Sequence, residues 1–485
     1  MTIPKYALYR FRRFNRNLAK LKSHLAVLFC FGLILGIISN SLLVILLFSV
    51  TLIILRFRII SSFFLLTGLL LGTIWIQHSL KLLDDAKVMN EYFENVNLEV
   101  VEPPIKNDYS QSIIVKLEGI YGNAIAEIPT SFKLEVGSKI LASAQITYHK
   151  FQPELKKYED HLISKKVLYK LEIIEIFSVK NSGTLYSLQS VRRNFITELN
   201  NLLPPEHAGL VNGMLFGTNE GISDTSIEIL KNTGLTHIIS ASGFNVMIVY
   251  TTIKSVLFLL KRTYRNIISL SVTFLYILLI GVHILPALRA FYMLLLLIIG
   301  KELGRKPTVV LLILASASLI LLSYPLYYKN ISFQLSLIAT SCLFIFSENF
   351  SLWFDKRNIP EVLSEPLSAT LSVLTGTTPV SFFAFGKVSL IAPLSNLILV
   401  PLTPIIMYLG VCLLLISRIS TNILANLFIF IVKIICSFFF NTATLLSNEN
   451  LSSTSSSIVV LVFVFIIISI LIYIDKKNVS QKFKN

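Results

Sequence analysis

Charged residues are scarce in this sequence. Asp, Glu, Lys and Arg make up only 14% of its 485 residues, whereas hydrophobic residues make up 54%. A soluble domain keeps a charged surface, so this composition excludes an ordinary soluble protein. Most of the chain consists of apolar runs of about 17 to 25 residues, the length of helix that crosses a bilayer. The sequence therefore predicts a multi-pass membrane protein.

The cysteines and histidines also give no sign of a disulfide, a metal site or a catalytic cluster. The cysteines lie in apolar runs without a C-x-x-C spacing and are interpreted as small buried hydrophobic residues: Cys30, Cys342, Cys412 and Cys436. The seven histidines form no H-x-x-x-H or H-E-x-x-H cluster, and no G-x-x-x-x-G-K-[ST] phosphate loop occurs. We therefore expect no metal site, no cofactor, and no nuclease or ATPase activity in this chain.

Positive charge exceeds negative charge, with a formal net charge of +16. The long polar segment from Lys81 to Glu206 holds 15 Lys and Arg against 17 Asp and Glu, so the excess lies in the apolar parts and their short loops. Basic loops on the cytoplasmic side produce this pattern in membrane proteins. The net charge by itself therefore does not indicate a polyanionic partner.

Twelve membrane-spanning helices are predicted from the apolar runs. Three precede the polar segment, at 24–39, 41–55 and 59–80. Nine follow it, at 235–260, 266–283, 286–300, 308–324, 331–347, 362–386, 389–416, 421–445 and 457–474. With the N-terminus in the cytoplasm, alternation places the basic loops, Arg418 among them, and the C-terminus in the cytoplasm as well.

The polar segment shows a different texture. Residues 84–190 contain short stretches of alternating polarity broken by Gly, Asn and Pro, which indicates strands. Five or six strands in about a hundred residues suit an inserted extracytoplasmic all-β, OB-like domain, for which DNA contact and a structural or gating role both remain open. Residues 191–234 are predicted as amphipathic connecting helices, on the membrane surface or against the bundle.

The predicted organisation is that of an α-helical polytopic membrane protein with one inserted β domain. In chain order it comprises a basic tail with three helices (1–83), the OB-like domain (84–190), connecting helices (191–234), a helical core (235–475) and a cytoplasmic tail (476–485).

The stretch "THIISASGFNVMIVY", residues 236–250, is apolar but carries polar and small groups at predicted membrane depth: His237, Ser240, Ser242, Gly243 and Asn245. Lipid offers such groups no hydrogen-bond partner, so they usually face another helix or a water-filled cavity. We expect this stretch to form an inward-facing helix that lines a channel or lets neighbouring helices approach closely.

Two later stretches also place polar groups within apolar runs. "GVHILPALRAFYM" puts Pro286 and Arg289 where two predicted spans meet. An ionisable residue at membrane depth indicates function or contact with water, although an arginine that reaches the membrane surface would also fit. Gln334 in "NISFQLSLIATS" requires either an interhelical hydrogen bond or a place in a pore lining.

Prolines crowd the stretch "LTGTTPVSFFAFGKVSLIAPLSNLILVPLTP", residues 374–404, which contains Pro379, Lys387 and Asn396. Prolines at this density break helices, and irregular backbone inside a bilayer persists only where protein or water satisfies it. The stretch therefore predicts discontinuous helices along a transport pathway, without identifying the cargo.

In this order, the stretches resemble the ComEC-type competence protein family, the DNA-uptake channels of naturally transformable bacteria. The likeness runs from "MLFGTNEGISDTSIEILKNTG" and "LTHIISASGFNV" through "LPALRAFYMLLLLIIGKELGRKPT" and "ISFQLSLIAT" to "PVSFFAFGKVSLIAPLSNLILVPLTP". It covers residues 205–415 well and extends more loosely toward residue 25.

The resemblance implies a water-filled channel in the bacterial cytoplasmic (inner) membrane that passes single-stranded DNA into the cytoplasm. A wet path is required because a charge at the bilayer centre costs several kcal/mol. Basic residues near the channel mouths would gather the strand, and the candidates are Arg262, Arg289, Arg305 and Lys387. The implied partners are the lipid bilayer, a periplasmic or surface DNA receptor, a cytoplasmic translocase, a separate nuclease and further copies of this chain.

Two departures from the family pattern stand out. Asn245 occupies the position at which the family usually has a histidine, which keeps a polar group and removes a titratable one. Many members also carry a C-terminal metallo-β-lactamase-like domain, which we expect to be absent from this polypeptide.

Two other classes of function remain as alternatives. A secondary transporter or flippase for a small molecule or lipid-linked sugar would suit the broken helices, and it predicts internal repeats, of which none is visible. A membrane enzyme such as a glycan polymerase would place acidic or histidine clusters within the spans, which contain almost none.

Overall fold

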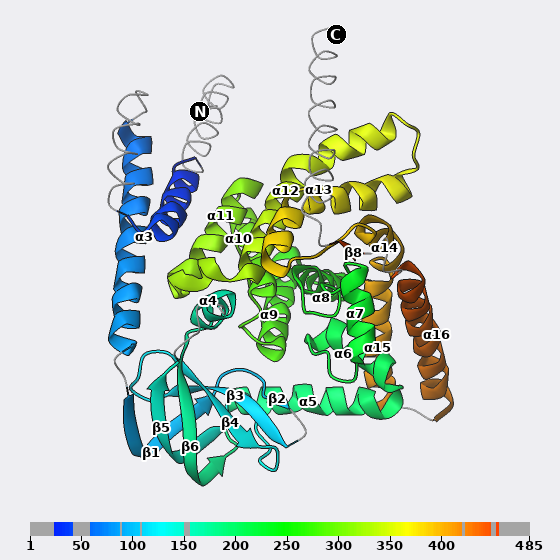
Figure 1. Ribbon diagram of the computed structural model, residues 1–485. Coiled ribbons are helices and arrows are strands. Elements are labelled where there is room, and N and C mark those ends of the chain that lie inside the picture. Colours follow the sequence, from blue (N-terminus) through cyan, green and yellow to red (C-terminus); the bar gives the residue numbers. More distant parts are fainter. Residues whose placement is uncertain are drawn as a thin grey trace, which may run out of the picture. The chain divides into compact units, whose positions relative to one another are not determined.

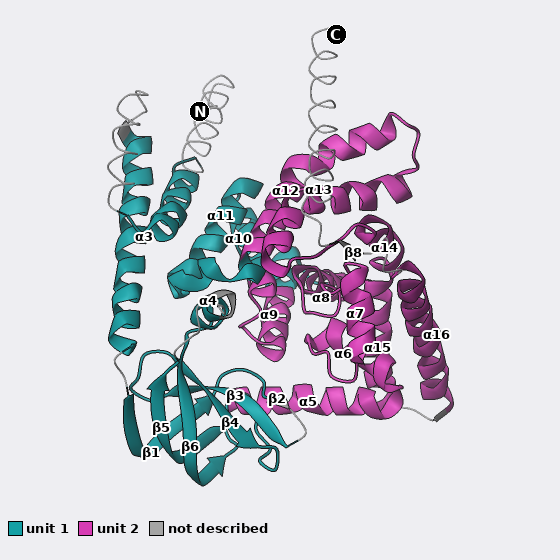
Figure 2. Cartoon of the chain, viewed as in Figure 1, with its two compact units in different colours: residues 1–182, 260–267, 289–333 teal, residues 183–259, 268–288, 334–485 magenta. Residues whose placement is uncertain are grey.

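The computed structural model describes residues 24–41, 59–87, 90–106, 109–149, 156–419, 422–447 and 453–454 (Figure 1). The chain divides into two compact units, which Figure 2 distinguishes by colour. Unit 1 comprises residues 1–182, 260–267 and 289–333, and unit 2 comprises residues 183–259, 268–288 and 334–485. Both units contain apolar helices, and unit 1 also contains a large β-sheet.

The polar segment of unit 1 folds into a mixed sheet, which confirms the predicted β-rich region. Its strands are β1 (Asn90–Val100), β2 (Ile105–Lys106), β3 (Ser110–Leu117), β4 (Asn123–Pro129), β5 (Lys139–Tyr148) and β6 (Val167–Lys180). The pairing order is β1-β5-β6-β4-β3-β2, and β1 also pairs with β3, which closes the five long strands into a ring. β4 and β6 run parallel, whereas the other long-strand pairs are antiparallel.

Alternating polarity explains these strands. In β3, Ile113, Val115 and Leu117 are buried, whereas the residues between them are less so. This period of two places one face of each strand in the interior of the ring. Two irregularities in the pairing of β6 with β5 leave Ile174 and Phe177 exposed, as β-bulges commonly do.

Two helices of unit 1 pack at unusually close range. They are the helix His24–Ser39 and α3 (Ile59–Ala86). A Cβ atom added to Gly36 would collide with the backbone of Leu69, so the contact requires glycine. The contact residues advance in the same direction along both helices, which therefore run parallel. The glycines of the contact have a spacing of four on each helix: Gly32, Gly36, Gly68 and Gly72.

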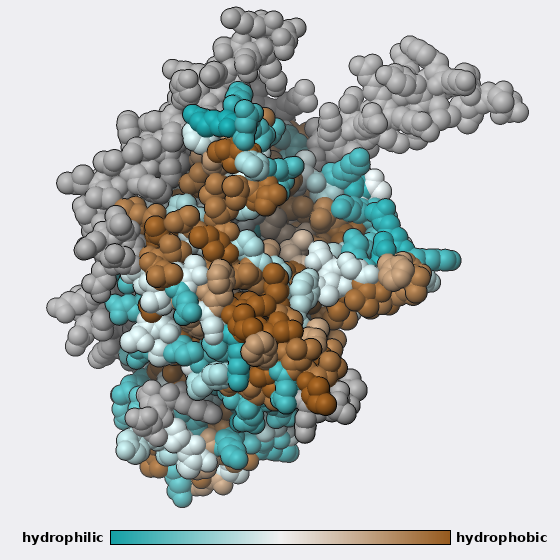
Figure 3. Space-filling model, turned by 90° about the vertical axis from the view of Figure 1, so that its right-hand side faces the viewer, coloured by the Kyte–Doolittle hydropathy of each residue, from teal (hydrophilic) through white to brown (hydrophobic). Residues whose placement is uncertain are grey.

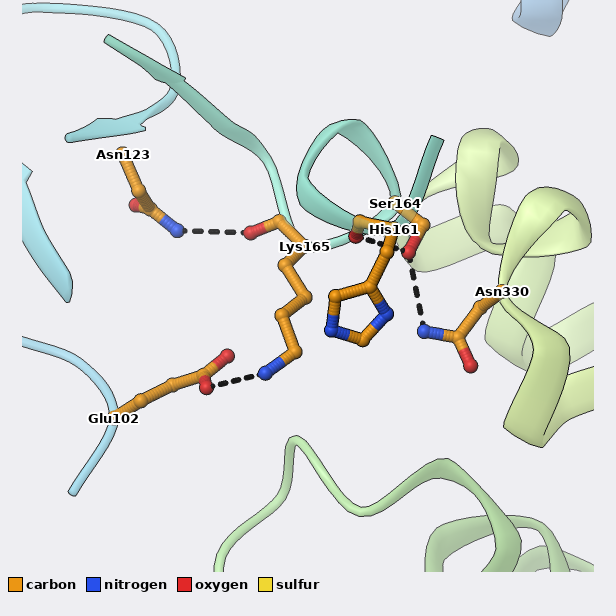
Figure 4. Close-up of polar contacts among 6 residues, drawn as sticks. All are labelled: Glu102, Asn123, His161, Ser164, Lys165 and Asn330. Atoms are coloured by element: carbon orange, nitrogen blue, oxygen red, sulfur yellow. Dashed lines mark hydrogen bonds and ion pairs between the residues drawn. The ribbon is translucent and has the colours of Figure 1, made fainter. Parts of the chain in front are cut away.

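A short helix, α4 (Lys156–Ser164), joins the sheet to the helices of unit 1 (Figure 4). Asn330 Nδ2 donates a hydrogen bond to Ser164 Oγ at 3.1 Å. The Oδ1 atom of Asn330 accepts one from the backbone nitrogen of Phe333 at 3.2 Å, and this caps the start of α12 (Ile331–Asp355). Asn330 therefore connects α4 to the first turn of α12.

Two ion pairs reinforce this connection. Lys165 Nζ lies 2.7 Å from a carboxylate oxygen of Glu102, which holds α4 to the loop after β1. Lys329 Nζ lies 2.6 Å from Asp160 Oδ1, and Lys329 ends the 3-10 helix η2 (Pro325–Lys329). The other helices of unit 1 are most of α10 (Leu285–Glu302) and α11 (Val309–Ser323).

Unit 2 is built around α6 (Pro205–Phe216), in which every residue from Ala208 to Phe216 is buried. This helix packs against α5 (Thr184–Leu202), α15 (Leu402–Ile419) and α16 (Asn422–Leu446). Its other helices are α7 (Asp224–Asn232), α8 (Gly243–Val256), most of α9 (Arg262–Ile280), most of α12, α13 (Glu361–Phe385) and α14 (Ala392–Leu399). A small sheet pairs β7 (Val388–Ser389) with β8 (Ser453–Thr454).

Five described helices are long and apolar enough to cross a membrane: α3, α9, α12, α13 and α16. α14 and α15, bent by 41°, count as a sixth if they form one span. The helical, multi-pass character is thus supported, but twelve spans are not found in the described ranges. The predicted span 457–474, and 41–55 beyond Ser41, lie outside the residues that the structure describes.

The helix surfaces agree with contact to lipid. On the face shown in Figure 3, hydrophobic side chains gather over the helices. In α16, Phe430, Ile434 and Phe438 form an exposed stripe with helical spacing, whereas Cys436 and Phe439 are fully buried on another face. Such an apolar outer surface suits a helix at the edge of a membrane bundle.

The predicted span 235–260 is wrong at its start. Residues 235–242 form turns, and α8 begins only at Gly243. With 14 residues at 1.5 Å each, α8 is about 21 Å long, shorter than the ~30 Å hydrocarbon core. Ser240 and Ser242, which precede this helix, favour turns over a continuing helix.

A contact between α5 and the end of α15 conflicts with the predicted alternation of the spans. Glu198 of α5 accepts hydrogen bonds from Ser417 and Arg418, in the last turn of α15. The predicted alternation put Arg418 in the cytoplasm and the polar segment, including Glu198, outside. Because the two residues are in contact within unit 2, an even number of crossings separates them. Seven spans were predicted between Glu198 and Arg418. If 235–260 is not a span, six remain, which is an even number.

Candidate functional site

The polar stretch 236–250 divides into a loop and a helix. α7 ends before Gly234, whose φ of +74° turns the chain, and His237 Nδ1 lies 3.0 Å from the carbonyl oxygen of Gly234. Ser240 is exposed, and Ser242 is the residue directly before α8. His237, Ser240 and Ser242 therefore belong to the α7–α8 loop, which corrects the expectation that they lie on an inward-facing helix.

Asn245 holds α8 against α6. Its side chain is buried, and Nδ2 donates a hydrogen bond to the carbonyl oxygen of Met214 at 2.8 Å. Ser242 Oγ donates to Asn245 Oδ1 at 3.1 Å. Of the two predicted roles, lining a channel or packing helices, these contacts support packing.

Residues from the proline-rich stretch meet this loop. Ser395 Oγ of α14 donates a hydrogen bond to the carbonyl oxygen of Thr233 at 2.7 Å. A Cβ atom on Gly234 would lie 2.8 Å from the Cβ of Ala392. The two segments therefore approach so closely that this position suits glycine. The structure thus brings together two stretches whose bonded residues, Thr233 and Ser395, are 162 positions apart in the sequence, and we call this contact the α7–α14 junction.

Unpaired polar atoms lie on the proline-rich side of the α7–α14 junction. Within the described part of the chain, Ser389 Oγ and Asn396 Oδ1 are buried and have no hydrogen-bond partner. Lys387, just before β7, is exposed. The junction therefore combines unsatisfied buried oxygens with an accessible cation.

The remaining predicted residues lie elsewhere. Pro286 and Arg289 are in the first turns of α10, and the Arg289 side chain is buried, with Nη1 3.2 Å from the sulfur of Met293. Burial argues against a side chain that reaches the membrane surface. Gln334 lies half-buried near the start of α12.

The prolines act differently from one another. α13 continues through Pro379, half-buried within the helix, so the expected break does not occur there. The break does occur between α14 and α15, which are separated by Val400 and Pro401 and bent by 41°. A discontinuous helix is therefore confirmed for one part of the predicted stretch.

The structure adds a polar stripe on α13 that sequence reasoning did not single out. Ser364, Ser368 and Ser372 are buried at a spacing of four. Ser368 and Ser372 each donate to the carbonyl oxygen four residues earlier at 2.6 Å. The spacing was visible in "EVLSEPLSATLSVLT", and it satisfies two of the hydroxyls within the helix.

A sequence profile described as "Competence protein" matches residues 214–477, more than half of the chain. This chain belongs to the competence protein family. The matched region contains the α7–α14 junction and α8 through α16, so the resemblance expected from the sequence is confirmed.

Two relatives support the assignment to the competence protein family. ComE operon protein 3 of Bacillus subtilis (strain 168) is 23% identical over 257 residues, which are 52% of this chain and 32% of that protein. An uncharacterized protein of Aquifex aeolicus (strain VF5) is 26% identical over 193 residues, 40% of this chain and 43% of its own. The matched parts are thus less than half the length of either relative. No solved structure matches the chain.

Proposed function

We propose that this competence family protein passes single-stranded DNA across the cytoplasmic membrane of a bacterium during natural transformation. Membership of the family, which implies a role in DNA uptake, carries the proposal. The matched region covers four of the five helices long and apolar enough to span a membrane, which suits a transmembrane path. Beyond a role in DNA uptake, the proposal includes conduction of the strand through a channel in this protein.

The bent pair α14–α15 offers a physical basis for such a path. A helix broken within the bilayer exposes backbone groups that protein or water must satisfy. Asn396 Oδ1, buried and unpaired in α14, would find a partner in water or a passing strand. Lys387, exposed in the short segment between α13 and β7, would attract phosphates in a salt-dependent way.

We also propose that the sheet of unit 1 is an OB-type barrel. The ring β1-β3-β4-β6-β5, with a parallel pair between its third and last strands in chain order, supports this class. Its ligand is not specified by this surface, because an acidic residue, Glu172, is exposed on the same strand as the apolar Ile174 and Phe177. Contact with DNA and a gating role are both consistent with that surface.

Several partners belong to the proposal. The energy source would be a cytoplasmic translocase, because no nucleotide-binding loop occurs in the sequence. A surface or periplasmic DNA receptor, a separate nuclease and a pore of several copies complete it. The other candidate, a secondary transporter or flippase, is favoured by the same bent pair α14–α15.

Internalisation of labelled DNA tests the proposal. Cells would carry the intact gene, a deletion, Lys387→Gln, or Lys301→Gln as a control that removes an exposed lysine outside the junction. We expect the deletion to abolish cytoplasmic DNA while surface-bound duplex remains, and Lys387→Gln to reduce entry more than the control at equal membrane abundance. Unchanged internalisation in the deletion would refute DNA as the cargo and leave the transporter alternative.

A further inference from the structure

A lysine lies in the middle of the most apolar candidate span. Eleven residues of α16 precede Lys433 and thirteen follow it, which places it about 17 Å and about 20 Å from the helix ends. The helix has a mean hydropathy of 2.5. In the described part of the chain, Lys433 forms no ion pair within 4.0 Å. A charged group at this depth is costly and is therefore a strong indication of function.

A histidine from α6 reaches the same part of α16. His207 Nε2 and Ser437 Oγ share a hydrogen bond of 3.3 Å, one helical turn beyond Lys433. The His207 ring also stacks on Phe440, with centroids 6.5 Å apart and planes 19° apart. Two contacts thus fix the imidazole against α16 near the middle of the span.

The residue before it adds a carboxylate. Glu206 Oε1 accepts a hydrogen bond from the backbone nitrogen of Ser223 at 3.1 Å. Its other oxygen, Oε2, and His207 Nδ1 are both buried and without a partner among the described residues. A buried acceptor without a partner is unfavourable, so both atoms have capacity to bind a proton or a donor.

The charges around the imidazole have opposite signs. Lys433 is a basic residue on α16, and Glu206 is an acidic residue next to His207 on α6. Other charged residues also lie on the elements around α6. They are Arg192, Arg193 and Glu198 of α5, Asp224, Glu228 and Lys231 of α7, and Arg418 of α15.

We propose that Glu206, His207 and Lys433 form a proton-binding site at membrane depth, in which the His207 imidazole takes up and releases the proton. The proton comes from water and binds at Nδ1, and only this N–H bond forms or breaks. Uptake adds one positive charge to the site. The added charge repels Lys433, so protonation weakens the contact between α6 and α16.

A phosphate-binding site is the less fitting interpretation of the same residues. A phosphate would be attracted by Lys433, but the unpaired carboxylate oxygen of Glu206 would repel it. A proton suits both a carboxylate and an unpaired imidazole nitrogen. The inference does not depend on the cargo, because it concerns only side chains of unit 2.

Histidine-selective nitrogen NMR of the full-length protein in lipid nanodiscs tests the site. His207→Gln identifies the resonance, which we expect to titrate between pH 5 and 9. Glu206→Gln should lower its midpoint by about one pH unit, and Lys433→Met should raise it by a similar amount. Lys231→Met, an exposed lysine of α7, and His78→Gln, in α3, are controls that should leave the midpoint unchanged.

The two main variants act independently, so a failure of one to fold leaves the other as a test. Lys433→Arg, which keeps the charge, should keep the midpoint near that of the unmodified protein. A His207 resonance that does not titrate in this range overturns the proposal. So does a midpoint that neither Glu206→Gln nor Lys433→Met moves, since the imidazole would then be only a packing group.

Discussion

Arg418 donates two hydrogen bonds to one oxygen of Glu198, through Nε at 3.1 Å and Nη2 at 2.8 Å, while Ser417 Oγ donates to the other oxygen at 2.6 Å. The Arg418 guanidinium also lies over the ring of Phe195, 4.7 Å from its centroid. The side chain of Arg418 is 51% exposed and that of Glu198 is 23% exposed. Solvent therefore screens the ion pair, which alone contributes only about 0.2–1 kcal/mol. Its main consequence is topological, because two residues in contact are expected to lie on the same side of the membrane.

Cysteine labelling tests this topology. In a chain without its native cysteines, Asn201→Cys, exposed at the end of α5, and Arg418→Cys should react with a membrane-impermeant maleimide from the same side. The twelve-span alternation gives labelling from opposite sides, and that result would contradict the ion pair. Detergent-solubilised protein, in which both cysteines should react, is the control for accessibility.

Asn245→Leu should destabilise unit 2. The change removes the hydrogen bond to the Met214 carbonyl oxygen, which is then buried without a donor. Loss of such a bond costs about 1–3 kcal/mol, so thermal unfolding of the purified protein should shift to lower temperature. Thr251→Ala on the exposed side of α8 is the matched control, because its hydroxyl bonds only within the helix. Unaltered stability of Asn245→Leu would instead favour the channel-lining role.

Gly36→Leu should separate the parallel helices of unit 1. The new side chain cannot fit, because a Cβ at this position already collides with the Leu69 backbone. Overpacking of this kind typically costs about 1–3 kcal/mol. Ile38→Ala on the exposed face of the same helix should have little effect. A disulfide cross-link between cysteines placed at Leu33 and Leu69 reports the contact, and its persistence in Gly36→Leu would disprove this packing.

The junction of α4 with the sheet should weaken in acid. Burial and the charge of Lys165 lower the pKa of His161, while Glu102 raises it less. The folded protein then binds this proton more weakly than the unfolded chain, whose histidine pKa is about 6.5. Stability from this group is complete above that value and falls as the pH drops through it. Unfolding midpoints at pH 7.5 and 5.5 should differ less in His161→Gln than in the unmodified protein, and an equal difference in both would refute the effect.

The helical class, the β-rich insert and the family could be predicted from the sequence because each depends on long-range composition or on a run of residues. Apolar runs indicated α3, α12, α13 and α16, and alternation indicated β3. The parallel course of His24–Ser39 and α3 also agrees with a first and third span of one alternating series.

Other features could not be predicted from local patterns. Hydropathy alone gave 235–260 as a span, whereas Gly243 begins a helix of only 14 residues, held by a distant carbonyl at Met214. The roles of the glycines, and the meeting of Gly234 with Ala392, depend on tertiary contacts. Lys433 was visible within an apolar run, but its significance emerges only from the position of His207 beside it.

The enclosure of α6 has a consequence for biosynthesis. Nine consecutive buried residues of this helix rely on packing from α15 and α16, which emerge from the ribosome long after it. Until those helices are made, α6 lacks part of its packing partners. Its apolar residues must then be shielded by another protein, such as a chaperone or the insertion machinery. Closure of unit 2 is therefore a late event of assembly, and a chain interrupted before α15 leaves its central helix open to degradation.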